Sequence, residues 1–253
     1  MLRPSPTRHM LRLFTLGELR LETDDRRVVS RRRKPLILLA YLLRSGARPV
    51  SRTELTTLLW GHRVEAKARQ SLRRALLDIK QLVGDCISIT HDAAMVDRNA
   101  IELDIATFER EIEQGHDREA VARWTGAFLD GAEDAGELTL DLWLRTERAG
   151  LNSRLSFAFE RLLSSAEQRG AWRDAITIAR QWTDASPLDE RACTHLILAL
   201  RRKGHAVDAL ACHASFLARM KEEGGAEPSR TFVAMAHSPD EYVLAPEHRS
   251  TIA

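Results

Sequence analysis

Features that define several large protein classes are scarce or missing in this sequence. The longest uncharged apolar run, residues 35–43, is far shorter than the about 20 residues that a membrane span requires. Charged residues interrupt the only apolar N-terminal stretch, so no signal peptide is visible. The cysteines Cys86, Cys193 and Cys212 are an odd number and do not suggest a disulfide framework. We therefore expect a soluble cytoplasmic protein with reduced thiols and no membrane contact.

Motifs for catalysis and for cofactor binding are also missing. The sequence has no glycine-rich phosphate loop, no dinucleotide fingerprint and no nucleophile elbow. Cys193 with His195, and Cys212 with His213, are the nearest approach to a zinc site, but neither pair has the usual ligand spacing. The carboxylates of the second half are explained by solvated helix faces. The sequence therefore predicts a protein that is not an enzyme and that holds no metal and no cofactor.

Charge is distributed unevenly, although the formal net charge is only +2. Residues 1–103 contain 20 Lys and Arg against 11 Asp and Glu, whereas residues 104–253 contain 18 against 25. A basic first part and an acidic second part indicate two domains with different partners. The partner of the first is expected to be a polyanion.

The stretch 66–83 has the spacing of a helix with one buried face. Its apolar positions fall on one side: Ala68, Leu72, Ala75, Leu76, Ile79, Leu82 and Val83. The other side and its flanks carry Lys67, Arg69, Gln70, Arg73, Arg74, Leu77, Lys80 and Gln81. Arg can bond guanine and Gln can bond adenine in a DNA major groove. For such a helix taken alone, a solvated basic surface is the alternative. The elements before and after it are needed to choose between a DNA-binding helix and a solvated one.

The elements before this helix have clear sequence signals. Alternating apolar residues predict two short strands within 11–21, and Val28-Val29 a third. A helix is expected from Pro35 to Arg44, stopped by Gly46. Ser51 and Glu54 form a capping-box pattern at the start of a helix over Arg52–Trp60. A short capped helix, a tight turn and a basic helix together describe a helix-turn-helix.

A hairpin follows the basic helix, as expected for the wing of such a domain. Residues 87–89 and 95–96 flank a turn at His91, and residues 101–103 read as one more strand. The wing would reach DNA with His91 and Arg98. Four consecutive cations, Arg31 to Lys34, oppose the dipole of the helix that they precede, which is explained if they bind phosphate.

The second half reads as helical. Asp104 is placed to cap a helix over 105–114, a second helix is expected over 118–129, and a long third over 138–169 has Gly150 as a candidate break. Gly170, Asp174 and Ala175 recur 34 residues later as Gly204, Asp208 and Ala209. This is the tetratricopeptide period of about 34 residues, with small residues where paired helices approach. Such repeats build surfaces for protein or small-ligand binding.

The order of these motifs resembles a known family. The stretches LRLFTLGELRLE, RRKPLILLAYLL, VSRTELTTLLW and ARQSLRRALLDIKQLVGD resemble the OmpR-type winged helix of Streptomyces antibiotic regulatory proteins. DIATFEREIEQG, GAFLDG and LWLRTERAGL resemble their bacterial transcriptional activation domain. The fold expected is mainly α with small β: a disordered N-terminus at 1–9, a winged helix at 10–103, tetratricopeptide-like helices at 104–237 and a loose tail at 238–253.

The resemblance implies a transcription activator that binds direct repeats in double-stranded DNA as a dimer and recruits RNA polymerase. The polymerase contact would be the turn Gly61, His62, Arg63 and Val64, and the helical domain would pair protomers and offer a place for a small-molecule or protein effector. Base contacts are expected from Arg69, Gln70, Arg73, Arg74 and Leu77. Phosphate contacts are expected from Arg31, Arg32, Arg33, Lys34, Lys67 and Lys80. The alternative is a tetratricopeptide-type adaptor without sequence-specific DNA binding.

Overall fold

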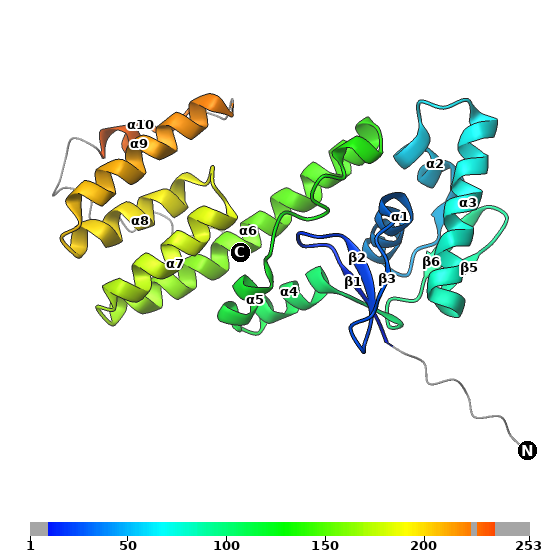
Figure 1. The fold of residues 1–253 in the computed structure, drawn as a ribbon, viewed down its shortest axis with the longest axis horizontal. Coiled ribbons are helices and arrows are strands. Elements are labelled where there is room, and N and C mark those ends of the chain that lie inside the picture. The colour runs from blue at the N-terminus through cyan, green and yellow to red at the C-terminus, as the bar shows by residue number, and fades with distance from the viewer. Residues whose placement is uncertain (1–9, 224–226, 236–253) are drawn as a thin grey trace, which may run out of the picture. The chain divides into compact units, whose positions relative to one another are not determined.

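The fold is mainly α with small β-sheets, as the sequence predicts (Figure 1). The computed structural model describes residues 10–223 and 227–235, so the tails expected at 1–9 and 238–253 lie outside the described residues. The chain divides into two compact units, Met1–Ala158 and Phe159–Ala253. The boundary expected after Leu103 falls inside the first unit. Within the described ranges, no helix is both long and apolar enough to cross a membrane.

A four-stranded sheet opens the first unit, with the strand order β3-β2-β1-β7. Its strands are β1 (Leu11–Phe14), β2 (Arg20–Thr23), β3 (Val28–Ser30) and β7 (Ile101–Leu103). The first three pair antiparallel, whereas β7 lies parallel to β1, with Leu11 opposite Ile101 and Leu13 opposite Leu103. The last predicted strand therefore belongs to this sheet and does not extend the hairpin.

The winged helix follows the predicted order of elements. It contains α1 (Arg33–Arg44), α2 (Arg52–Trp60) and α3 (Glu65–Val83), and a sheet of β4 (Val50–Ser51), β6 (Ala93–Val96) and β5 (Ile87–Ile89). α1 forms the centre of this core, since nearly every residue from Pro35 to Leu43 is buried. The wing is confirmed as an antiparallel pair of β5 and β6.

Only half of the predicted capping box forms at α2. The Ser51 hydroxyl accepts a hydrogen bond from the Glu54 amide at 3.1 Å, as expected. The Glu54 carboxylate does not return to the Ser51 amide, because it binds two other groups. It accepts from the Tyr41 hydroxyl at 2.7 Å and from Arg48 Nη2 at 2.9 Å. This carboxylate therefore ties α2 to the end of α1.

The helix expected over 118–129 is wrong in length, since α5 (Asp117–Arg123) ends six residues earlier. The chain then returns to β1, where Phe128 forms a bridge with Leu16 and the Leu129 amide donates to the Thr15 carbonyl at 2.7 Å. Gly17 and Gly126 allow this approach, because a Cβ on Gly126 would lie 2.8 Å from the Gly17 Cα. The strand edge offered backbone partners that a longer helix would have left unused.

Two further details at helices differ from expectation. α4 (Asp104–Glu113) begins one residue before the predicted start, so Asp104 is inside the helix and is not its cap. α6 (Leu138–Gln168) is continuous, so the break suggested at Gly150 is wrong. A helical glycine costs only about 1 kcal/mol, and buried neighbours such as Leu144, Leu151 and Leu155 hold the helix together.

The second unit is a set of packed helical hairpins. After the end of α6 come α7 (Trp172–Ala185), α8 (Glu190–Arg202), α9 (Ala206–Glu222) and α10 (Arg230–Ala234). The repeated glycines Gly170 and Gly204 both have positive φ, +67° and +84°, and precede α7 and α9. The repeated alanines Ala175 and Ala209 are fully buried. The 34-residue repeat is thus confirmed as a structural repeat of helix starts.

Candidate nucleic-acid interface

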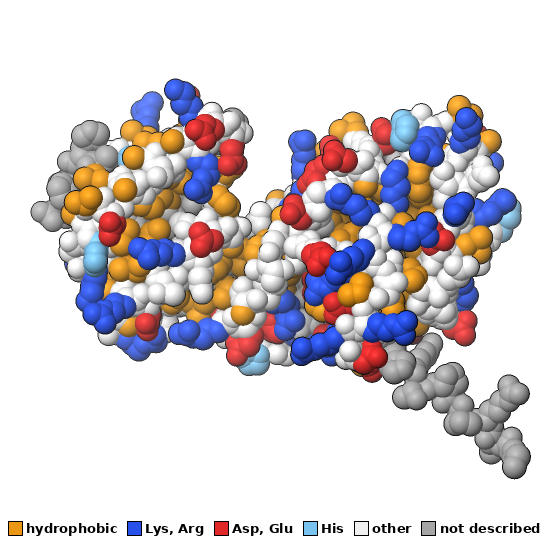
Figure 2. Space-filling model, viewed as in Figure 1, with side chains coloured by type: hydrophobic (Ala, Val, Ile, Leu, Met, Phe, Trp, Pro, Cys, Tyr) orange, Lys and Arg blue, Asp and Glu red, His pale blue; other side chains and the backbone are white. Residues whose placement is uncertain are grey.

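The helix α3 is two-sided, as its sequence predicts. Its buried residues are Ala68, Leu72, Ala75, Leu76, Ile79 and Val83, while the predicted core residue Leu82 is only half-buried. Lys67, Arg69, Gln70, Arg73 and Arg74 are all exposed. Leu77 is 55% exposed among them, although it is apolar. Figure 2 shows Lys and Arg side chains gathered over the part of the first unit that carries α2 and α3.

The exposed side chains of α3 differ in whether they already have partners. Arg69 pairs with Glu65 one turn earlier, and Lys80 donates to Asp85 at 3.1 Å. Gln70, Arg73 and Arg74 have no hydrogen-bond or ion-pair partner among the described residues. Positions 70, 73, 74 and 77 form one stripe along the helix. This stripe is open for a partner over about 10 Å of helix length.

The four cations before and at the start of α1, Arg31 to Lys34, have different surroundings. Arg31 lies 3.4 Å from Glu18, and Arg32 lies 2.8 Å from Asp78 of α3; both arginines remain 62% exposed. Arg33 is exposed as well, but its Nη2 donates to the Gly131 carbonyl and, at 3.3 Å, to the Asp130 carbonyl. All three arginines thus keep the exposure that phosphate binding requires, but the Arg33 guanidinium already bonds two backbone carbonyls.

Lys34 lies over the Trp60 ring, with Nζ 5.5 Å from the ring centre. Burial lowers the pKa of Lys34, and Arg63 nearby lowers it further, while Glu137 acts in the opposite direction. Lys34 therefore packs between α1 and α2 and is only partly exposed at the surface.

The wing places its expected residues at an exposed turn. His91 follows β5 and is almost fully exposed, with Nδ1 2.6 Å from Asp92 Oδ1. Arg52 of α2 holds the base of the turn, because its guanidinium donates to the Thr90 carbonyl at 2.9 Å. Arg98 is exposed after β6. The wing lies beside the C-terminal part of α3 (Figure 1).

The turn between α2 and α3 is tethered to the helical region that follows the winged helix. His62 pairs with Glu137, the residue just before α6, and Arg63 Nη1 donates to Ser71 Oγ at 3.3 Å. Val64 is 73% exposed, and Leu138 at the start of α6 is also exposed. The ion pair thus holds the turn at the start of α6, and each of the two segments carries an exposed apolar residue.

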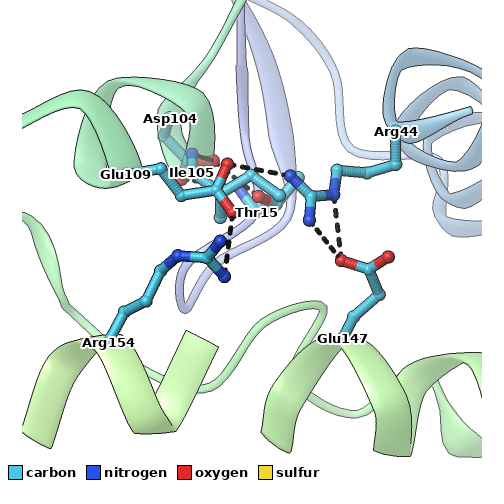
Figure 3. A network of polar contacts seen from close by, with 7 residues as sticks. All are labelled: Thr15, Arg44, Asp104, Ile105, Glu109, Glu147 and Arg154. Atoms are coloured by element: carbon cyan, nitrogen blue, oxygen red, sulfur yellow. Dashed lines mark hydrogen bonds and ion pairs between the residues drawn. The ribbon is translucent and has the colours of Figure 1, made fainter. Parts of the chain in front are cut away.

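A largely buried ionic network, which sequence reasoning missed, joins three helices of the first unit (Figure 3). Arg44 of α1 lies 2.9 Å from Glu109 of α4 and 2.6 Å from Glu147 of α6, and Arg154 of α6 lies 3.6 Å from Glu109. Burial opposes the charge of Arg44, but the two carboxylates outweigh it, and the pKa of Arg44 is raised. The partners are 65 and 103 positions from Arg44, so no local pattern could reveal them.

Asp104 forms a second internal tie, between β1 and the start of α4 (Figure 3). Its Oδ2 accepts from the Thr15 and Leu16 amides at 2.7 and 2.8 Å, and its Oδ1 accepts from the Thr15 hydroxyl and the Ile105 amide. Burial raises the pKa of this carboxyl, and the four donors offset part of that rise. The winged helix and the first helices after it are therefore bonded as one body.

Candidate metal ligands do not gather in the described parts of the chain, where no group of three His, Cys, Asp or Glu lies close enough to hold an ion. Cys193 and Cys212 do meet, at 3.4 Å between their sulfur atoms, but His195 is directed toward Glu167 and His213 toward the Phe232 carbonyl. The two cysteine–histidine pairs noted in the sequence are thus not one four-residue site.

Comparison with known proteins supports a regulatory family. Over 233 residues the chain is 27% identical to the regulatory protein AfsR of Streptomyces coelicolor. The aligned region covers 86% of this chain but only 23% of the length of AfsR. The structure of Mycobacterium tuberculosis EmbR, solved in complex with a low-affinity phosphopeptide, shares the fold. Its TM-score is 0.66 at 21% identity, covering 90% of this chain and 64% of that one.

Residues 93–238 match the family described as the bacterial transcriptional activator domain. The match includes the wing strand β6, the ionic network's α4 and α6, and the helical hairpins of the second unit. The resemblance to Streptomyces antibiotic regulatory proteins that the sequence motifs indicated is confirmed, and a regulator, not an enzyme, is what the match describes. The chain belongs to the bacterial transcriptional activator domain family.

Proposed function

We propose that this protein is a sequence-specific DNA-binding transcription activator whose helix α3 enters the major groove. The observation that carries the proposal is the unpartnered stripe of Gln70, Arg73 and Arg74 on an exposed helix face. Its length of about 10 Å corresponds to about three base steps. Leu77 at the end of the stripe would contact a thymine methyl group. Arg69 is a further base contact, once Glu65 releases it.

The phosphate contacts surround this stripe. Arg31 and Arg32 are exposed, and Lys67 is exposed at the start of α3. Lys80 would exchange Asp85 for phosphate, and Lys34 would add positive charge from its place over the Trp60 ring. The contribution of Arg33 to phosphate binding would be smaller, because its guanidinium is held by the Asp130 and Gly131 carbonyls. His91 and Arg98 of the wing are proposed to reach the backbone or minor groove. In this arrangement α3 reads sequence, and the cations around it set position and affinity.

Recruitment of RNA polymerase is assigned to the turn Gly61–Val64. Its tether to Glu137 and its exposed Val64 support a preformed contact surface. We expect Val64→Ser to lower activated transcription in a purified system with RNA polymerase while leaving DNA affinity unchanged. Equal loss of both would contradict a role confined to polymerase.

Two protomers are proposed to bind direct repeats side by side, with the helical hairpins assisting their pairing and accepting a small-molecule or protein effector. Exposed apolar residues of α9, Val207 and Leu210, support a protein contact there. Sedimentation with and without a two-repeat duplex tests the pairing. One protomer per two-repeat duplex at saturation would contradict it.

A mobility-shift assay on the DNA upstream of the gene tests the central proposal. Arg73→Ala and Arg74→Ala should each weaken specific binding by about 1–3 kcal/mol, as for a lost bidentate base contact. Arg173→Ala is a matched control, since that arginine is exposed on α7 in the other unit. Unchanged binding by both α3 variants would refute the groove assignment. Sequence preference no greater than the non-specific level would instead favour the adaptor, for which the helical repeat is the supporting observation.

A further inference from the structure

Two cysteines from consecutive helices meet in the second unit. Cys193 belongs to α8 and Cys212 to α9, and their Sγ atoms are 3.4 Å apart. Cys193 is buried, whereas Cys212 is partly exposed. Both thiols are free. A disulfide requires the sulfur atoms to approach to about 2.05 Å, which is a movement of about 1.4 Å from this separation.

The surroundings make the two sulfur atoms unequal. The pKa of the Cys212 thiol is lowered, mainly because Cys193 can donate a hydrogen bond to its thiolate, and the charges of Arg219 and Arg180 act in the same direction. The pKa of Cys193 is raised by the same hydrogen bond and by burial. A partly exposed thiol that loses its proton more readily than its buried neighbour is the arrangement found where one cysteine is oxidised first and a second resolves it.

We propose that Cys193 and Cys212 form an oxidation site that converts to an intramolecular disulfide with hydrogen peroxide. The Cys212 thiolate attacks one peroxide oxygen, the O–O bond breaks, and the hydroxide that leaves takes a proton to become water. Cys212 is then a sulfenic acid. Cys193 loses its proton and attacks Cys212 Sγ, the S–O bond breaks, and the displaced hydroxide takes that proton. Two thiols and one peroxide thus give one disulfide and two waters.

The disulfide would fasten α8 to α9 across the hairpin that connects them. The open end of that hairpin is already tied, since Arg219 of α9 donates to the Pro187 carbonyl before α8, and His213 joins the middle of α9 to the Phe232 carbonyl of α10. A covalent bond between its helices would restrict the conformations of the unfolded chain and so raise the unfolding temperature. The oxidised second unit is therefore expected to be the more stable form.

Cys86 provides a control within the same chain. It is buried in the winged helix, and the structure gives it no sulfur neighbour among the described residues. Full-length reduced protein is treated with hydrogen peroxide, quenched, unfolded and titrated for free thiols. Three thiols should be found before treatment and one after it, with peptide mass spectrometry identifying a Cys193–Cys212 link that dithiothreitol reverses.

Variants separate the two roles. Cys193→Ser keeps a hydroxyl that can donate to Cys212, and should leave Cys212 as a sulfenic acid that dimedone captures. Cys212→Ser should leave Cys193 reduced under the same treatment, and Cys86→Ser should behave as the wild type. Oxidation should raise the unfolding temperature of the wild type and not of Cys193→Ser, with circular dichroism showing that each variant is folded. Three remaining thiols in peroxide-treated wild type, a link between two chains, or preferential oxidation of Cys86 would each overturn the proposal.

Discussion

Arg44, the last residue of α1, donates from Nη2 to the Glu147 carboxylate of α6 at 2.6 Å. The same guanidinium reaches Glu109 of α4 through Nη1 at 2.9 Å. One side chain therefore joins the central helix of the winged helix to two helices of the activator-family region. All three groups are about four-fifths buried, so their charges depend on one another.

Arg44→Ala should destabilise the first unit. The variant leaves the largely buried Glu147 carboxylate without its cation and Glu109 with only Arg154, 3.6 Å away. We expect a loss of about 2–3 kcal/mol in the free energy of unfolding. Urea denaturation followed by tryptophan fluorescence measures it. Arg48→Ala is the matched control, because Arg48 also bonds a glutamate but from an exposed position, and should change the midpoint far less. A loss no larger than that of the control would mean that the network contributes little.

The phenol of Tyr41 should titrate late. Burial, and then the hydrogen bond to Glu54, raise its pKa from 10.0 to about 12. The pKa of Tyr41 is higher in the folded state than in the unfolded state. The contribution of this phenol to the stability of the folded protein is therefore complete below the unfolded pKa of 10.0 and is lost as the pH rises through about 12. Glu54→Gln should lower this pKa, which the tyrosinate absorbance of a Tyr242→Phe background reports. An identical titration in both proteins would show that Glu54 has no influence.

The same Glu54 gives an acid-side prediction of opposite sign. Its pKa is lowered, chiefly by the hydrogen bond from Arg48 and also by that from Tyr41, while burial acts against them. A depressed folded pKa contributes stability above the unfolded value of 4.5, and this contribution is lost as the pH falls through the folded pKa. Denaturation curves across this acid range should therefore be less pH-dependent for Glu54→Gln. A wild-type slope in the variant would contradict the assignment.

Two glycine-to-alanine changes should act in opposite directions. Gly126→Ala should lower stability by more than about 1 kcal/mol, because its Cβ would lie 2.8 Å from the backbone of Gly17, which has no flexible side chain to move aside. Gly150→Ala should raise stability by about 0.5–1 kcal/mol, since Gly150 is inside the continuous α6 and a Cβ there meets only the end of the Arg154 side chain at 3.8 Å. Thermal unfolding of both variants tests the pair. A stabilised Gly126→Ala would show that β1 and the 125–130 segment separate readily.

Variants of Arg31, Arg32 and Arg33 should differ in how strongly their DNA binding depends on salt concentration. Arg31→Ala and Arg32→Ala should weaken binding to all duplexes and reduce the slope of log affinity against log salt by about 1 each. Arg33→Ala should leave this slope nearly unchanged and lower stability, because its guanidinium is held by the Asp130 and Gly131 carbonyls. Binding measured at several salt concentrations, with unfolding curves, distinguishes the two effects. A reduced slope for Arg33→Ala alone would reverse the assignment.

Local sequence patterns were sufficient for most elements of the winged helix. Ser51 predicts the start of α2, the spacing of apolar residues predicts the two faces of α3, and their alternation predicts the wing. The pairing of β7 with β1 was not predictable in this way, since a strand's alternation does not name its neighbour. Nor was the early end of α5, because the competing backbone partners at Thr15 and Leu16 are more than 100 positions away.

Local sequence is enough to predict which residues of a helix face solvent or core and where helices begin, because these depend on neighbours within a few residues, and the repeat that starts α7 and α9 is visible as a 34-residue spacing. Which cations remain available and which are already bonded depends instead on tertiary packing. Arg32 and Arg33 are adjacent and chemically identical, yet one keeps an exposed guanidinium beside Asp78 and the other binds two carbonyls. The same holds for Cys193 and Cys212. Their meeting depends on how α8 packs against α9, since long-range packing, and not local pattern, places one side chain beside another.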